Sequence, residues 1–228
     1  MVNVPTRPSF TVSSSAADPM SRLAGPASSL ALRSETAAWL VRLARHELAR
    51  AMRVPGVTLD PPPADPRLDE PVRGFVSWHL AGRLVGCIGL VESAMPLREF
   101  VSRFSVQAGM YDRRTPSLEP QQLERLDFEL HLLTERAPLV DASGTPVRGL
   151  KAIAAALEPG VDGLWLTHPS GARAFYLPSV WEQLSTPGAF VDELARKAGL
   201  DPRAAACDEC TGAVMRAWTL HDYANSGA

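Results

Sequence analysis

A single thiol placed between two glycines is the best candidate for chemistry in this chain. It is Cys87, in the run Leu-Val-Gly-Cys-Ile-Gly over residues 84–89. Glycine weakens the interior of a strand, so Gly86 and Gly89 require a reason, either a bulge or a backbone kept bare for close approach. Such a cysteine could act as a nucleophile if a cation, a helix N-terminus or a metal lowers its pKa. The competing interpretation is an inert strand residue, because free cysteine is among the most buried residue types.

The residues around the thiol predict a β-hairpin. Residues 75–80 and 83–90 are both strand-like, and Ala81-Gly82 between them is typical of a tight two-residue turn. Side chains alternate between the two faces of a strand, so the register of this hairpin decides which residues lie beside the thiol.

A two-residue turn places Cys87 opposite Val76. Arg83 is then on the same face as the thiol, roughly 13 Å away along the strand, and His79 is on the opposite face. This register disfavours a Cys–His couple. A one-residue slip or a bulge at Gly86 would bring His79 and the thiol to the same face.

Helical and strand-like patterns are mixed along the rest of the chain. Helices are predicted from residue 34 to just before residue 55 and over residues 97–108, 150–157 and 187–198; further strands are predicted over residues 127–134, 163–167, 173–177 and 214–220. Hairpins mixed with helices favour an α+β fold, with a mixed, largely antiparallel sheet and flanking helices, over a doubly wound parallel sheet.

Composition restricts the classes of function. The chain has 228 residues, 46% of them apolar and 21% charged, as in a globular protein. The formal net charge of -2 gives no basic field for nucleic acid. No apolar run approaches the roughly 20 residues that span a bilayer. Neither nucleic acid nor a membrane is therefore an expected partner.

The start of the chain differs from the rest. Residues 1–33 are rich in Ser, Ala and Pro and lack the pattern of a secretory signal, so we expect a disordered tail followed by a folded domain over residues 34–222. Three cysteines without such a signal indicate free thiols in a reducing compartment. The expected location is the cytoplasm.

Other residues of reactive type give weaker signals. Cys207 and Cys210 form a lone Cys-x-x-Cys, whereas zinc would need two further ligands, so we expect functionless loop cysteines, with a labile disulfide as the alternative. His131 alternates with Glu129 on a strand and is interpreted as a solvated or locally hydrogen-bonded residue in preference to a general base. No phosphate-binding loop is present. No metal or cofactor is predicted.

Several motifs together resemble one family. The run over residues 84–89 is similar to the Leu-Arg-Gly-Cys-Ile-Gly signature of the AMMECR-domain family, known in prokaryotes as AmmeMemoRadiSam system protein A. Further matches follow in order along the chain. Asp112, Arg114, Pro116 and Leu118 match four positions of the family's Asp-Pro-Arg-Phe-Pro-Pro-Leu loop. Residues 159–164 match its Pro-Gly-Val-Asp-Gly-Leu turn, and residues 177–184 and 196–200 are similar to its C-terminal helical segments. The resemblance covers residues 38–200.

One departure from the family pattern concerns the thiol directly. Val85 stands where the signature has arginine, and the predicted alternation puts it on the face of Cys87. The signature arginine could bind an anion or lower the pKa of the thiol. Either Arg83 or Arg114 takes that place, or this member lacks part of the family's chemistry.

The resemblance implies two packed subdomains with a cleft between them, and association with a Memo-like protein and a radical S-adenosylmethionine enzyme. We expect a cytoplasmic accessory protein that binds a ligand or partner in this cleft. The expected binding residues are Gly86, Cys87, Ile88, Gly89, Arg83 and Arg114. The alternative is a thiol enzyme that uses Cys87 as nucleophile and Arg114 to hold an anion.

Overall fold

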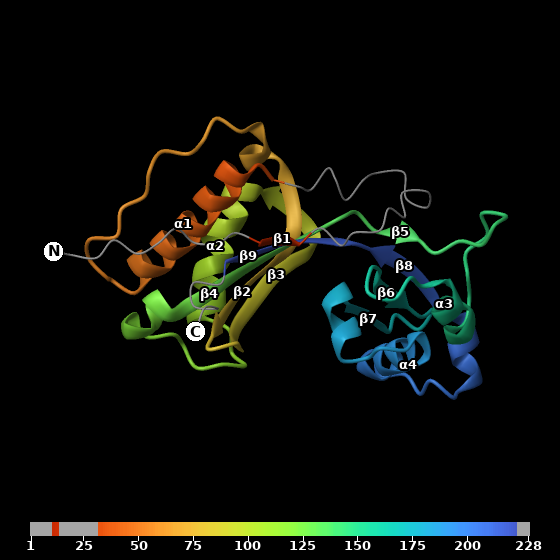
Figure 1. Ribbon diagram of the computed structural model, residues 1–228. Coiled ribbons are helices and arrows are strands. Elements are labelled where there is room, and N and C mark those ends of the chain that lie inside the picture. The colour runs from red at the N-terminus through yellow and green to blue at the C-terminus, as the bar shows by residue number, and fades with distance from the viewer. Residues whose placement is uncertain (1–10, 14–31, 223–228) are drawn as a thin grey trace. The chain divides into compact units, whose positions relative to one another are not determined.

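The structure, a computed structural model, describes residues 11–13 and 32–222 and divides into two compact units (Figure 1). The first unit contains the described residues up to 133 together with 218–222, and the second contains residues 134–217. The tail expected over residues 1–33 lies almost wholly outside the described residues. No helix in the described part of the chain is long and apolar enough to cross a membrane.

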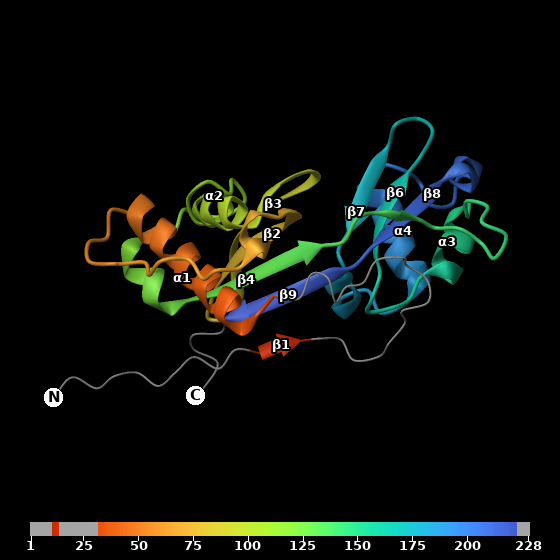
Figure 2. The ribbon, with the colours of Figure 1, turned by 90° about the horizontal axis from the view of Figure 1, so that it is seen from above.

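The first unit is a sheet with two helices on one side (Figures 1 and 2). Its five strands lie in the order β1-β9-β4-β2-β3, so that β3, which carries Cys87, is an edge strand. The elements are β1 (Thr11–Ser13), α1 (Ser34–Ala51), β2 (Pro71–Leu80), β3 (Arg83–Pro96), α2 (Leu97–Met110), β4 (Leu126–Leu133) and β9 (Ala217–Asp222), with 3-10 turns at Pro66–Asp69 and Pro120–Arg125.

Each of the two helices buries one apolar face against the sheet. Leu40 and Leu48 of α1 and Phe100 of α2 are fully buried in one apolar cluster with Trp78 of β2 and Phe128 of β4. The alternation along β2 and β4 therefore sends these aromatic side chains toward the helices. The intervening residues of both strands point to the opposite face of the sheet.

The β2–β3 hairpin forms as predicted, but its register shifts. The turn residues Ala81 and Gly82 both have positive φ, as a tight hairpin turn requires. Beyond the turn, Cys87 lies opposite Ser77 instead of the expected Val76. Val85 is the extra residue of a bulge, since the partners of its two neighbours are adjacent in β2.

This bulge reverses the predicted faces. Cys87 shares a face with Ser77 and His79, so the prediction that His79 points away from the thiol is wrong. Arg83 pairs with Leu80 at the turn, before the bulge, and lies on the face opposite Cys87, contrary to expectation. The predicted pairing of Cys87 with Val76 fails for the same reason.

The glycines beside the thiol permit close packing. A Cβ atom on Gly86 would lie 1.9 Å from the carbonyl oxygen of Ala108 in α2, and one on Gly89 would lie 2.0 Å from that of Gly74 in β2. Both of the predicted reasons for glycine therefore apply, because the strand bulges at Val85 and its backbone is closely approached. The approaching groups are the protein's own helix and strand.

The second unit is a four-stranded sheet in the order β5-β8-β6-β7 with two helices packed against it (Figure 1). Its elements are β5 (Ala137–Pro138), α3 (Leu150–Ala156), β6 (Gly163–Thr167), β7 (Arg173–Tyr176), α4 (Pro187–Lys197) and β8 (Thr211–Met215), with 3-10 turns at Pro178–Glu182 and Ala205–Glu209. The α+β class is confirmed in both units.

The strand predicted over residues 214–220 is in fact two strands. β8 ends at Met215 and belongs to the sheet of the second unit, whereas β9 begins at Ala217 and belongs to the sheet of the first. Arg216 stands between them. A continuous strand-like pattern does not reveal a change of pairing partner, since alternation is the same in both sheets.

Substitution of Gly86 tests the close packing of β3 on α2. Gly86→Ala should lower the free energy of unfolding by about 2 kcal/mol, because the added methyl overlaps the Ala108 carbonyl. Gly188→Ala in α4 is the matched control, since its Cβ would meet nothing within 4 Å and alanine favours a helix. Urea unfolding measures both, and equal stability of the two variants would contradict the packing role.

Candidate functional site

The backbone of Cys87 is held by the loop that follows α2. The Asp112 carboxylate accepts a hydrogen bond from the Cys87 N–H at 2.9 Å, and Arg114 Nη2 donates to the Cys87 carbonyl oxygen at 2.6 Å. Arg114 also donates to Asp112 from Nε at 2.9 Å and from Nη2 at 2.8 Å. Asp112 and Arg114 thus form a latch on the edge strand.

The latch satisfies backbone groups that an edge strand otherwise leaves unpaired. It also engages Nε and Nη2 of Arg114, although this side chain is 69% exposed. Arg114 therefore acts first on the protein's own backbone. Its proposed contact with an anion would have to use the remaining nitrogen, Nη1.

The electrostatics of the latch favour a charged pair. The hydrogen bond from Arg114 lowers the pKa of Asp112 well below its ordinary range, against the effect of burial, and the Cys87 N–H adds to the lowering. Asp112 remains ionised at any pH near neutrality.

A cluster of titratable side chains lies on the same face of the sheet as the thiol. Glu129 of β4 is its centre: Oε1 lies 3.2 Å from His131 Nε2 and 3.1 Å from His221 Nδ1, and Oε2 lies 3.8 Å from His79 Nε2. The four side chains are between 10% and 22% exposed. With Cys87, Ser77 and Asp127, they form what we call the polar face.

Ion pairing keeps Glu129 charged. Burial alone would raise the pKa of this carboxyl, but the hydrogen bond from His131 and the charges of His131, His221 and His79 outweigh it and lower the pKa. The second ring nitrogen of His131 bonds the hydroxyl of Thr219 at 3.0 Å. Of the two roles expected for His131, solvated or locally hydrogen-bonded, the structure has the second, since the residue is 8% exposed and contacts Glu129 and Thr219.

Asp127 is the one unsatisfied group of this face among the described residues. It pairs with His79 across the β2–β4 ladder and is 7% exposed. Its Oδ1 atom is buried without a hydrogen-bond partner in the described part of the chain. A buried acceptor left in this state costs about 1–3 kcal/mol, so a donor placed beside it would be stabilised.

The thiol itself is half-buried and protonated. Burial raises the pKa of Cys87, the charges of Asp112 and Glu129 raise it further, and the hydrogen bond with Ser77 and the charge of Arg114 only partly oppose this. A raised pKa is the opposite of what an activated nucleophile needs.

The structure brings together only part of the predicted set. Cys87 and the Arg114 loop meet, whereas Ile88 lies opposite Val76 on the face toward the helices and Arg83 is at the turn. Both glycines pack against backbone atoms.

Most of the polar face was missed at the level of sequence. Glu129 and His131 were recognisable from their outward alternation on one strand, and Ser77 and His79 would have joined them in the bulged register. His221 was hidden because it belongs to β9, which the prediction merged with β8.

The two remaining cysteines belong to the core of the second unit. Cys207 and Cys210 are buried free thiols, the first on the 3-10 turn Ala205–Glu209 and the second directly after it. Cys207 Sγ donates to the Asp201 carbonyl oxygen at 3.1 Å. Burial and the neighbouring Cys207 raise the pKa of Cys210 to about 12. Across the described residues, no three His, Cys, Asp or Glu side chains are placed to hold a metal ion.

Comparison with known proteins identifies the family. The AMMECR1 family model matches residues 41–216, which include the thiol, the latch and the Glu129 strand. The chain belongs to the AMMECR1 family. His221 lies just beyond the matched residues.

Archaeal relatives support this membership. The chain is 32% identical to Protein Ta0236 of Thermoplasma acidophilum over 163 residues, 70% of this chain and 74% of that protein. It is 30% identical to a protein of Thermofilum pendens over 184 residues, 74% of this chain and 81% of that protein. The crystal structure of Uncharacterized Protein PH0010 from Pyrococcus horikoshii has the same fold, with a TM-score of 0.68 and 22% identity over 83% of this chain and 93% of that one.

The charged Asp112 carboxylate of the latch should make the free energy of unfolding depend on pH. Because folding lowers the pKa of Asp112 below the unfolded value of about 3.9, its contribution to stability is complete above roughly pH 5. It is lost progressively as the pH falls below the unfolded value toward the lower pKa of the folded state. Asp112→Asn should lower the free energy of unfolding by about 2 kcal/mol at pH 7 and reduce the loss of stability between pH 5 and pH 3.

Asp60→Asn is the matched control for this measurement, since Asp60 is exposed and its ion pair with Arg42 spans 3.8 Å. Urea unfolding at several pH values compares the three proteins. A pH dependence of Asp112→Asn equal to that of the wild type would contradict the role of the latch.

Proposed function

We propose that this AMMECR1-family protein is an accessory binding protein that holds a ligand or partner group on its polar face beside Cys87. The observation that carries the proposal is the convergence of three histidine rings on Glu129 next to the thiol. An apolar sheet face would be less costly to bury, because each polar group placed there must be desolvated. A half-buried cluster of donors and acceptors is therefore better explained by binding than by stability.

The charges of this face favour a group that donates hydrogen bonds. Glu129 is ionised, and the Oδ1 atom of Asp127 is buried without a partner among the described residues. A ligand N–H or ammonium beside Asp127 would satisfy that oxygen. The latch supports such binding indirectly, since Asp112 and Arg114 fix the backbone from which the thiol projects.

The proposed partners are a Memo-like protein and a radical S-adenosylmethionine enzyme, and the proposed setting is the cytoplasm. The resemblance to AmmeMemoRadiSam system protein A supports the partners. The three cysteines are all free, as is usual in a reducing compartment. The net charge of -2 offers no attraction for nucleic acid, which we do not propose as a partner.

Purified partners test this function directly. The full chain is immobilised, and the Memo-like protein and the radical S-adenosylmethionine enzyme of the same organism are applied separately in biolayer interferometry. At least one should bind, and Glu129→Gln and Asp127→Asn should each weaken that binding about tenfold, equivalent to about 1.4 kcal/mol.

Glu193→Gln is the control, because Glu193 lies exposed on α4 of the second unit. A substitution at Gly86 is unsuitable here, since it would displace α2. Binding by neither partner, or equal binding by all variants, would contradict the proposal.

The alternative function is that of a thiol enzyme, with Cys87 as nucleophile and Arg114 holding an anion. The shared face of Cys87 and His79 favours it, and the raised pKa of the thiol opposes it. The two functions differ in the reactivity of the free protein.

The pH dependence of Cys87 alkylation distinguishes a binding protein from a thiol enzyme. The reaction of Cys87 with iodoacetamide should accelerate up to at least pH 9, with an apparent pKa above the free-cysteine value of about 8.5, because burial disfavours the thiolate. Mass spectrometry locates the label, and Cys87→Ser should abolish rapid labelling, since Cys207 and Cys210 are buried. An apparent pKa below 7 would favour the enzyme instead.

A further inference from the structure

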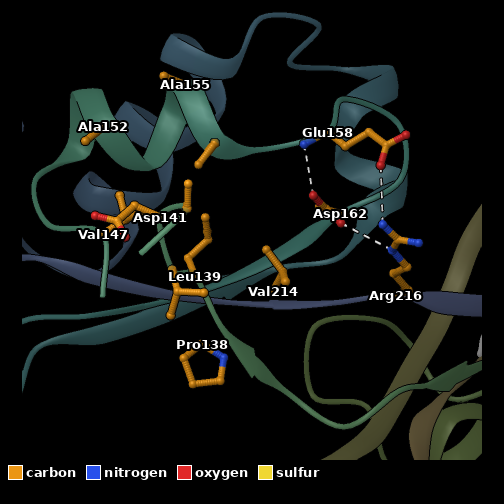
Figure 3. A pocket seen from close by; sticks show the side chains of 13 residues that line it. Pro138, Leu139, Asp141, Val147, Ala152, Ala155, Glu158, Asp162, Val214 and Arg216 are labelled. Atoms are coloured by element: carbon orange, nitrogen blue, oxygen red, sulfur yellow. Dashed lines mark hydrogen bonds and ion pairs between the residues drawn. The ribbon is translucent and has the colours of Figure 1, made fainter. Parts of the chain in front are cut away.

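The second unit contains a cavity that has no part in the polar face. It has a volume of about 640 Å³ and lies between α3, the strands β5 and β8, and the loop of residues 139–147 (Figure 3). Sites for small molecules usually measure about 300–1,000 Å³ and combine apolar walls with a few convergent polar groups. The cavity meets both conditions.

The walls are apolar because α3 lines the cavity with alanine. Ala152, Ala155 and Ala156 border the cavity, whereas Leu150 and Ile153 of the same helix are buried in the core of the unit. Leucine or isoleucine in place of these alanines would occupy much of the space. The opposite wall is formed by branched side chains such as Leu139 and Val214.

A charged group closes one end of the cavity (Figure 3). Arg216 Nη2 lies 3.3 Å from Glu158 Oε2, and its Nε lies 3.4 Å from Asp162 Oδ1. Both contacts are longer than the 2.7–2.9 Å typical of a charge-assisted hydrogen bond. Asp162 is additionally held by the backbone N–H of Glu158, which donates to its Oδ2 at 2.9 Å.

The balance of charge at this end is negative. One arginine stands between two carboxylates, which leaves one negative charge at this end. The carboxylate of Asp141 also lines the cavity, but it lies away from Arg216 (Figure 3) and accepts hydrogen bonds from Ser143 and Thr145. The side chains of Arg216 and Asp162 are 12% and 8% exposed, so they are poorly screened, whereas Glu158 is 39% exposed and accessible from the cavity. A ligand with one positive charge would balance the group, and an anion would oppose it.

We propose that this cavity binds a small-molecule amine with an apolar body. The apolar part packs against Ala155, Ala156 and Val214, and the primary ammonium donates to the Glu158 carboxylate. Arg216 then remains paired with Asp162 and is not available to attract the carboxylate of a ligand. The proposal uses residues of the second unit alone and is independent of binding at the polar face.

Three probes of equal shape test the charge preference. 4-Phenylbutylamine, 4-phenylbutanol and 4-phenylbutyrate are titrated into the isotope-labelled full chain, and the affinities are taken from amide chemical shifts. The amine should bind about fivefold more tightly than the alcohol and the carboxylate more weakly still, with shifts confined to residues around the cavity.

Two variants test the place of binding. Ala155→Leu should lower the affinity for the amine at least about tenfold, because the larger side chain fills the cavity. Ala189→Leu is the same change at an exposed alanine of α4 and should leave the affinity unchanged. Glu158→Gln should reduce the advantage of the amine over the alcohol.

Both alanines are exposed helical positions, so the variants are expected to fold. Absence of saturable binding, equal or tighter binding of the carboxylate, equal affinity of amine and alcohol, or an unchanged amine affinity in Ala155→Leu would each overturn the proposal.

Discussion

One extra residue in an edge strand decides which side chains meet in the first unit. Without the bulge at Val85, the alternation of β3 would turn Cys87 toward the helices and place it opposite Val76. With the bulge, the thiol faces Ser77 and lies on the face that carries Glu129. Because β3 is an edge strand, the outward backbone groups of Cys87 have no partner strand, and the Asp112–Arg114 latch satisfies them. The close approach of α2 to Gly86 holds the same segment from the other side.

Local patterns in the sequence were sufficient for the elements of the fold. The helices α1 and α2, the turn at Ala81-Gly82 and the helix predicted over residues 187–198 each depend on residues a few positions apart, and each is confirmed. The bulge and the separation of β8 from β9 could not be predicted in this way. Both depend on which strand lies beside which, and hydrophobic alternation is the same whichever partner a strand has.

The site was less predictable than the fold for a related reason. Cys87 and Arg114 were recognisable because they lie in family motifs, but their contacts differ from those expected, since Arg114 binds the backbone of the thiol residue and Asp112. Glu129, His131 and His221 come from strands separated by more than 80 residues in the chain. No single stretch of sequence contains their cluster, so only the pairing of strands could show it.

The polar face and the cavity differ in the existing contacts that a ligand must replace when it binds. At the polar face, Glu129 is already surrounded by three imidazole rings, so a ligand that bonds it must displace or share an existing contact. At Asp127, a ligand donor that reaches the buried Oδ1 atom breaks no existing hydrogen bond, because this atom has no partner in the described part of the chain. In the cavity, the contacts of Arg216 are long and Glu158 is accessible, so a cation can be accommodated without breaking a strong pair. Binding at the polar face should therefore depend on the shape and donor geometry of the ligand, and binding in the cavity on its charge and apolar volume.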